Sequence, residues 1–207
     1  MSSTPWIGHP KDRHFRVLQV PALANEETEN ECLIYCLWMY ISYLSNSYPD
    51  PSVNNKISDV RIEDIKSKIT IRESGWTPDE DELEAVSNDI GPVQFNHTLE
   101  RNSPSKGALE SIIQKYLDDD IPIIPFINAR ELRSGTKGGV HAVVVVGMSE
   151  ESVAINDPWG YLYDIVEKDQ FIKAWQDTVN QYVTIKVGEQ QRMGESPENG
   201  GDSNEFR

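Results

Sequence analysis

The residues of this chain best suited to chemistry are Cys32, His141 and Asp157. Cys32 begins an apolar stretch, and a cysteine at a helix N-terminus has a lowered pKa because unpaired N–H groups and the helix dipole favour the thiolate. His141 begins a run of β-branched residues, and Asp157 ends the next apolar run. A thiolate, an imidazole and a group that orients the imidazole can together perform nucleophilic catalysis on an acyl group.

Two short strands must bring the imidazole and the carboxylate together. Residues 140–147 and 152–157 have strand-like patterns, and a tight polar turn joins them. An antiparallel pair over these ranges places His141 beside Asn156 and Asp157. Either the Asp157 carboxylate or the Asn156 amide would then hold the imidazole in one tautomer and one orientation.

The expected reaction begins with attack by the Cys32 thiolate. His141 forms an ion pair with the thiolate and then donates a proton to the leaving amine. The backbone N–H of Cys32 points toward the developing oxyanion. A second donor is still required, and each such donor contributes about a hundred- to a thousandfold in rate.

Each of these residues also has a purely structural interpretation. A cysteine such as Cys32 is often a buried core thiol. Cys36 lies one turn deeper on the same helix face; we expect a core residue there, and it is the fallback nucleophile. A disulfide between the two cysteines would close a very short loop with poor geometry. Asp157 precedes Pro158 and is a natural turn residue in any protein.

The remaining pattern predicts helices in the first half and antiparallel strands in the second. Thr77 as N-cap and Pro78 in the first turn mark one helix start. Helices are expected over residues 32–44, 61–69, 77–88, 105–117 and 168–175. Strands are expected over residues 15–20, 121–127, 140–147, 152–157, 161–166 and 181–187. Two prolines predict an edge or irregular position for 121–127. This segregation indicates an α+β fold.

The chain length bounds the number of domains. The 207 residues suffice for one well-formed core and are too few for two ordinary domains. Residues 1–14 are expected to form a flexible arm, and residues 15–187 the folded domain. The acidic composition from residue 188 to 207, rich in Gly, Glu, Asn and Ser, predicts a disordered tail.

The charge and the cysteine content limit which classes of binding partner and which cellular compartment are expected. The net charge of -15 argues against nucleic acid, because phosphate binding needs clustered Lys and Arg. The excess of acidic residues indicates a solvated, negatively charged surface. Alternatively, it would favour a substrate that contains a basic segment. No segment is long enough to span a bilayer, and the N-terminus does not resemble a secretory signal. The two cysteines suggest a reducing compartment, so we expect a cytoplasmic protein. No spacing of Cys and His suggests a metal site, and no cofactor is expected.

Four motifs spread over residues 17–187 share the order of one enzyme family. They are Val20-Pro21-Ala-Leu-Ala-Asn25, Cys32-Leu-Ile-Tyr-Cys36-Leu-Trp-Met39, His141-Ala-Val-Val-Val-Val-Gly147 followed by Asn156-Asp157-Pro158, and Phe171-Ile-Lys-Ala-Trp175. In the same order they resemble the Val-Pro-x-x-x-Gln segment, the cysteine helix Cys-Gly-x-Ala-small-Leu-Ala-Met, the His strand with its Asp turn, and the Phe-x-x-x-Trp helix of bacteriocin-leader-processing peptidases. Those enzymes are papain-like cysteine peptidases that cleave after a double glycine.

The resemblance implies a papain-like fold and a cysteine peptidase with a Cys32-His141-Asp157 triad. In such a fold a helical part, including the nucleophile helix, packs on a C-terminal antiparallel sheet. The substrate would be an extended peptide or a protein tail. Cleavage of a peptide or isopeptide bond after small residues such as glycine is implied by the resemblance alone.

The chain departs from the family pattern at two positions. The family has Gly after the cysteine, where this chain has Leu33. The oxyanion Gln of the family lies about six residues before the nucleophile, where this chain has Glu26, and an ionised Glu cannot donate a hydrogen bond. Asn25 has the right amide chemistry, one methylene short, and matches the Val-Pro segment better. We therefore expect Asn25 in the oxyanion hole, with Asn30 in reserve.

Two other functions fit the same residues. The missing Gly and Gln favour a catalytically weak or inactive peptidase-like module that binds a peptide without cutting it. An acyl transferase with the same triad would accept an amine in place of water. Thiol reactivity separates the first alternative from a hydrolase, and the products formed in added amine separate the second.

Overall fold

The structure is a computed structural model that describes residues 6–7, 15–24, 30–47, 51–71, 79–91, 93–100, 103–133 and 139–186. The predicted acidic tail over residues 188–207 lies outside these ranges, as does Asn25. The predicted arm lies outside them too, except for strand β1 (Trp6–Ile7), which pairs with β2 (Phe15–Arg16).

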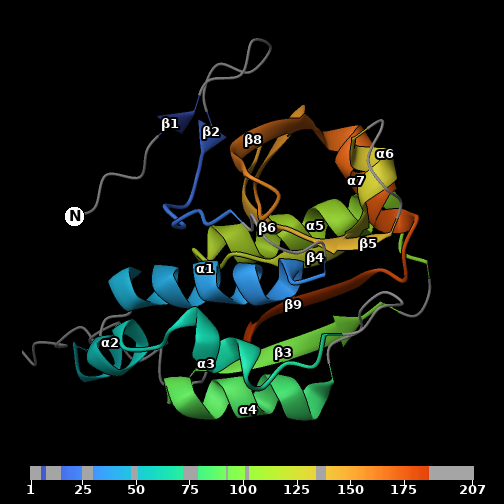
Figure 1. Ribbon diagram of the computed structural model, residues 1–207. Helices are drawn as coiled ribbons and strands as arrows, with labels where there is room; N and C mark the ends of the chain where they lie inside the picture. The colour runs from blue at the N-terminus through green and yellow to red at the C-terminus, as the bar shows by residue number, and fades with distance from the viewer. Residues whose placement is uncertain are drawn as a thin grey trace, which may run out of the picture.

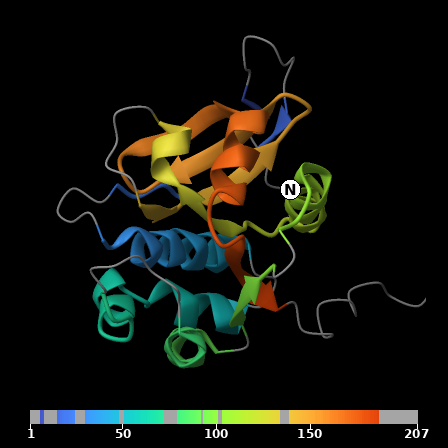
Figure 2. The ribbon, with the colours of Figure 1, turned by 90° about the vertical axis from the view of Figure 1, so that its right-hand side faces the viewer.

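A central helix organises the fold. Helix α1 (Cys32–Ser47) is buried on nearly every side, as its uniformly apolar sequence predicts. A layer of helices that also contains strand β3 (Gln94–Leu99) lies on one side of it, and other strands lie on the opposite side, as both ribbon views show (Figures 1 and 2). The helical layer comprises α2 (Pro51–Ser58), α3 (Ile62–Lys66) and α4 (Glu80–Ile90). The first residue of α1 is thereby placed next to the strands, because α1 packs on β5 and β6.

The strands form antiparallel sheets. The larger sheet has the order β3-β9-β4-β5, with bounds Gln94–Leu99, Gln181–Lys186, Ile124–Asn128 and Val140–Ala142. The smaller sheet has the order β6-β7-β8, with bounds Val144–Met148, Ser152–Asp157 and Tyr161–Glu167. The remaining helices are α5 (Lys106–Asp118), α6 (Ala129–Leu132) and α7 (Lys168–Gln176). The predicted α+β class is confirmed.

The strand that begins with His141 differs from its prediction. Residues 140–147 divide at Val143 into β5 and β6, which belong to different sheets. His141 pairs with Ile127 of β4, while Val144 pairs with Asn156 of β7. The expected hairpin therefore forms only beyond Val143, and His141 approaches Asp157 across the junction between two sheets.

Strand β4 is irregular, which is one of the two alternatives predicted for it, but it does not lie at an edge. It lies between β9 and β5, although Pro125 cannot donate a hydrogen bond. Ile124 and Pro125 pair with β9, and the pairing with β5 begins at Phe126. The Pro125 carbonyl accepts from the N–H of Val143 at 3.4 Å. Because β4 changes partner at this residue, no ladder bond requires a Pro125 N–H.

Helix boundaries follow local capping. Ser105, the first residue of the helix predicted over 105–117, caps α5, with its hydroxyl accepting from the N–H of Ala108. The N-cap of α4 is Asp79, whose side chain accepts from the N–H of Asp81 at 3.1 Å; the predicted cap, Thr77, lies outside the described residues. Four elements were not predicted: β1, α2, α6 and β3, which pairs with β9. Of the strand predicted over residues 15–20, only β2 forms.

Candidate active site

Cys32 is the first residue of α1, as expected. The carbonyl of Glu31 accepts the N–H of Tyr35 at 3.2 Å and so starts the helix. The Cys32 sulfur accepts a hydrogen bond from the backbone N–H of Ala142 at 3.4 Å, although 110 residues separate them. The side chain is 8% exposed. Helix α1 thus presents a nearly buried thiol to the strand that contains His141.

His141 lies between the sulfur and a carboxylate. Its Nε2 is 2.7 Å from Oδ1 of Asp157, and its side chain also hydrogen-bonds Cys32. Since Nε2 is engaged by the carboxylate, Nδ1 is the ring nitrogen that faces the thiol. The structure therefore brings all three residues together from α1, β5 and β7.

Asp157 ends β7, where the register with β8 shifts between Ile155 and Asp157. Its Oδ1 also accepts from the backbone N–H of Trp159 at 2.9 Å, and its Oδ2 accepts from Nη2 of Arg133 at 3.3 Å. The side chain is 1% exposed. A buried carboxylate needs such donors, because an unpaired charge away from water is strongly unfavourable.

Asn156, the alternative orienting residue, contacts a different part of the fold. Its Nδ2 donates to the carbonyl of Val20 at 2.9 Å, and its Oδ1 accepts from the N–H of Tyr163 at 3.0 Å. The Tyr163 hydroxyl donates to the same Val20 carbonyl at 3.1 Å. Successive strand residues point to opposite faces, so Asn156 holds the Val20 segment while Asp157 faces His141.

The electrostatics favour an ion pair between sulfur and imidazole. Burial raises the pKa of the Cys32 thiol, but bonding and charge from His141 and the Ala142 N–H outweigh burial, so this pKa lies below its ordinary value. Burial lowers the pKa of His141, but hydrogen bonds to Asp157 and Cys32 raise it to about 9. Burial also raises the pKa of Asp157, yet His141, the Trp159 N–H and Arg133 bring it below its usual range.

Cys36, the fallback nucleophile, has the opposite environment. It is fully buried, and its pKa is raised well above the ordinary value by burial and then by the negative charges of Cys32 and Asp157. A thiol that stays protonated and has no access to solvent is unreactive. Both cysteines are free, in line with the expectation that they form no disulfide.

The departures from the family pattern have different structural contexts. Leu33 is 3% exposed and belongs to the hydrophobic core, so the residue after the thiol is part of the packing. Asn30 is exposed and precedes Glu31, which is buried and pairs with Lys66 at 2.8 Å. Asn25 and Glu26 lie outside the described residues, and the oxyanion assignment stays a prediction.

Two contacts at the site were missed by sequence reasoning. Trp159 stacks on the His141 ring with centroids 3.9 Å apart. Arg133 reaches Asp157 from a position 24 residues away along the chain. An arginine at the start of a polar loop has no spacing signal that would link it to Asp157. For Trp159, the only sequence signal was its position two residues after Asp157.

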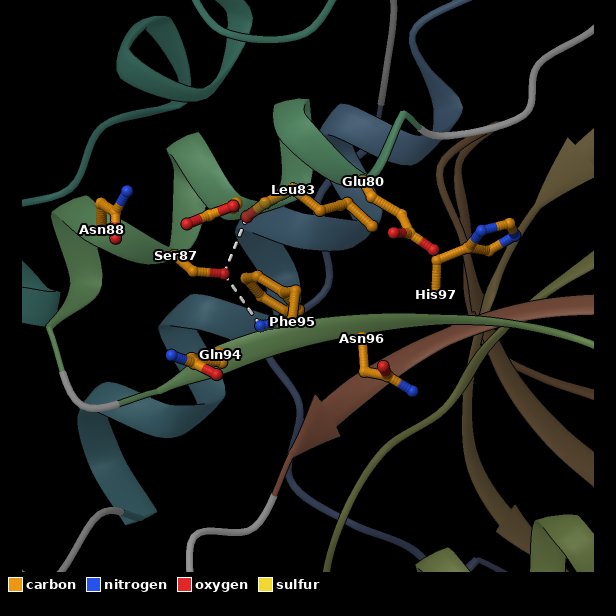
Figure 3. Close-up of a pocket in the computed structure, with 9 residues that line it drawn as sticks. Glu80, Leu83, Ser87, Asn88, Gln94, Phe95, Asn96 and His97 are labelled. Atoms are coloured by element: carbon orange, nitrogen blue, oxygen red, sulfur yellow. Dashed lines mark hydrogen bonds between the residues drawn. The ribbon is translucent and has the colours of Figure 1, made fainter.

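A separate pocket lies between α4 and β3 (Figure 3). Its volume is about 340 Å³, and polar side chains dominate its lining. Figure 3 shows Glu80 and His97 at one end and Asn88 and Gln94 at the other. Neither Cys32, His141 nor Asp157 lines it.

Over the described part of the chain, no group of three or more His, Cys, Asp or Glu is arranged to hold a metal ion. No helix in that same part is long and apolar enough to cross a membrane.

Solved structures with similar folds are found at low sequence identity. A candidate C39-like peptidase from Bacillus anthracis aligns with a TM-score of 0.60 and 15% identity, over 84% of this chain and 98% of that one. A double glycine motif protease from an AMS/PCAT transporter, solved with its leader peptide, aligns with a TM-score of 0.54 and 16% identity, over 82% and 93%. The peptidase domain of Streptococcus ComA, a bifunctional ABC transporter, aligns with a TM-score of 0.50 and 14% identity, over 79% and 96%. These likenesses establish a shared fold.

Family membership rests on the sequence itself. No curated protein matches the chain. The sequence model of the Peptidase_C39 like family, however, matches residues 17–183. That range includes Cys32, His141 and Asp157, and it confirms the resemblance found in the motifs. Since the match spans most of the chain, this protein belongs to the Peptidase_C39 like family.

Proposed function

We propose that this protein is a cysteine peptidase, a thiol hydrolase that cleaves a peptide or isopeptide bond. Cys32 is the nucleophile, His141 the acid and base, and Asp157 the orienting residue. The observation that supports this function best is the contact chain from sulfur through imidazole to carboxylate. It joins α1, β5 and β7 and places a thiol of lowered pKa against an imidazole of raised pKa.

The reaction follows from the side chains in contact. The Cys32 thiolate attacks the carbonyl carbon, and a tetrahedral oxyanion forms. As the C–N bond breaks, the His141 imidazolium donates its proton to the leaving amine, which leaves a thioester on Cys32. Neutral His141 then takes a proton from water, whose oxygen attacks the thioester. The acid product departs, and the thiolate–imidazolium pair is restored.

Stabilisation of the oxyanion requires donors at the start of α1. The backbone N–H of Cys32 is one donor, because the first N–H groups of a helix have no partner within it. The Asn25 side-chain amide is the second donor in this proposal. The segment before it is held by Asn156 and Tyr163 through the Val20 carbonyl.

The proposed substrate is an extended peptide or protein tail with small residues, such as glycine, before the cleaved bond. Support comes from the fold shared with a double glycine motif protease solved with its leader peptide. The net charge of -15 favours a substrate with a basic segment. Two free thiols suit a reducing compartment, and we place the protein in the cytoplasm.

Thiol labelling tests the nucleophile without knowledge of the natural substrate. Iodoacetamide should label Cys32 rapidly below neutral pH, and labelling should slow in His141→Ala, because the imidazolium stabilises the thiolate. Peptide mapping of Cys36→Ala should show unchanged labelling at Cys32, and Cys32→Ser should show almost none. Equal and slow labelling of the wild type and His141→Ala would contradict the proposal.

A peptide-binding module without hydrolysis is the second candidate. Leu33 and Glu26, at the positions of the family Gly and Gln, favour it. Peptides that contain Gly-Gly followed by a cargo segment separate the two functions: a hydrolase releases both fragments, and Cys32→Ala abolishes release while binding persists. Binding without release in the wild type would establish the module. Mass spectrometry in the presence of added amine would reveal an acyl transferase through amide products.

A further inference from the structure

An arginine contacts the side of Asp157 that faces away from His141. Nη2 of Arg133 is 3.3 Å from Oδ2 of Asp157, and the same nitrogen donates to Oδ2 of Asp164 on β8. The Arg133 side chain is 19% exposed. The two carboxylates therefore share one guanidinium at the base of the proposed active site, and Asp157 uses its two oxygens for different partners.

The backbone of this arginine is anchored to neighbouring elements. Arg133 follows α6, and its N–H donates to the carbonyl of Ala129 at 2.9 Å. The N–H of Ala129 in turn donates to the carbonyl of Gly139, next to β5. The Gln170 amide of α7 donates to the carbonyls of Glu131 and Leu132 at 3.0 and 3.1 Å. These bonds tie the backbone from which the Arg133 side chain extends to the strand that contains His141 and to α7.

We propose that Arg133 is a positioning residue for the peptidase reaction, which holds the Asp157 carboxylate against His141 and balances its charge. This inference rests on the proposed function, since it assigns a role within the same site. With Oδ2 bound to the guanidinium, the carboxylate plane is fixed and Oδ1 is directed at Nε2. Without that partner, a carboxylate that is 1% exposed would be left with an uncompensated charge on one side.

The charges around the imidazole determine the sign of the effect. In the ion-pair state, Cys32 and Asp157 are negative, and His141 and Arg133 are positive. These four charges sum to zero, and Cys36 beneath them stays neutral because of its raised pKa. Asp164 adds one negative charge farther out, where it is 28% exposed. A positive charge at Arg133 stabilises the thiolate and destabilises the imidazolium. The Cys32 thiol and the His141 imidazole therefore both titrate at a lower pH than they would without the Arg133 charge.

The direction of this pH shift can be tested by experiment, and a purely structural role of Arg133 would not produce it. The rate of Cys32 alkylation is measured against pH in the full-length chain, with iodoacetamide as the probe. Arg133→Met should move both limbs of the profile to higher pH and slow labelling about tenfold on the acid limb. Asp164→Asn removes a negative charge and should move both limbs to lower pH. The double variant should lie between the two, and Arg133→Lys should restore most of the wild-type profile.

A matched control comes from the helix that precedes Arg133. Arg130 on α6 is exposed, and Arg130→Met removes the same charge and should leave both limbs in place. If Arg133→Met keeps both limbs in place, or if Asp164→Asn moves them upward, Arg133 has no such role. Should Arg133→Met fail to fold, Asp164→Asn still tests the sign of the shift. A wild-type profile of an ordinary thiol, without a reactive plateau, would instead refute the proposed function itself.

Discussion

The ring of His141 stacks on the indole of Trp159, with centroids 3.9 Å apart and planes inclined by 22°. The backbone N–H of Trp159 donates to Oδ1 of Asp157, the same oxygen that contacts Nε2 of His141. One tryptophan therefore covers the imidazole with its side chain and bonds the carboxylate with its backbone. An imidazolium in this position gains from the negative face of the indole.

The side chain of Trp159 should matter to the rate, while its backbone bond survives substitution. We expect Trp159→Ala to lower kcat/KM about tenfold, because stacking and cation–π contacts of this kind contribute roughly 1–2 kcal/mol. Trp159→Phe keeps an aromatic face and should retain most of the activity. Steady-state kinetics on a peptide substrate measures both. An unchanged kcat/KM in Trp159→Ala would mean that the stack is incidental.

The dependence of activity on pH should reflect the ion pair. The pKa of His141 is about 9, so the imidazolium should persist to about that pH and activity should fall above it. Activity should also fall at acid pH, once the Cys32 thiolate takes up a proton. Asp157→Asn removes a negative charge that raises the His141 pKa, so the alkaline limb should move to lower pH.

The control for this profile is an exposed carboxylate outside the site. Asp59 follows α2 at the surface, and Asp59→Asn should leave both limbs in place. A profile of kcat/KM or of alkylation rate, recorded from about pH 4 to about pH 10, provides the measurement. An alkaline limb that rises or stays fixed in Asp157→Asn would contradict the electrostatic role of Asp157.

Asn156 should act through stability. Its amide bonds the Val20 carbonyl and the Tyr163 N–H in a fully buried position. We expect Asn156→Ala to lower the free energy of unfolding by about 1–3 kcal/mol, because both partners lose a buried hydrogen bond. Tyr163→Phe removes only the second donor to Val20 and should cost about 1 kcal/mol. Urea unfolding monitored by circular dichroism measures the free energy of unfolding of each variant. Equal stability of the wild type and Asn156→Ala would refute the stabilising role of Asn156.

Leu33 occupies the family glycine position as a core residue. We expect Leu33→Ala to lower the free energy of unfolding by about 2–5 kcal/mol through the lost buried side chain. Leu33→Gly should cost roughly 1 kcal/mol more, since glycine disfavours the helix. Thermal and urea unfolding of both variants measure the difference. If Leu33→Gly were as stable as the wild type, the leucine would not be part of the packing that the structure shows.

Local signals in the sequence located the helices well. The uniformly apolar stretch from Cys32 predicted a central helix, and α1 runs from Cys32 to Ser47. The helix predicted over residues 105–117 forms as α5, from Lys106 to Asp118. Such signals act within a few residues of the chain, where propensity and hydrogen bonding to the adjacent backbone decide the conformation. The chemical types of Cys32, His141 and Asp157 were readable for the same reason, since they belong to the residues themselves.

Long-range packing decided the rest. The break at Val143 sends β5 and β6 into different sheets, and β4 becomes an inner strand although it contains Pro125. The Arg133 contact with Asp157 has no local signal, because both residues are placed by elements that meet only in the folded chain. The sequence by itself therefore determined which groups could react and where α1, α3, α4, α5 and α7 form, but not α2 or α6. Tertiary structure alone decided their distances, their charged neighbours and the burial that shifts their pKa values, because these depend on contacts between residues far apart in the chain.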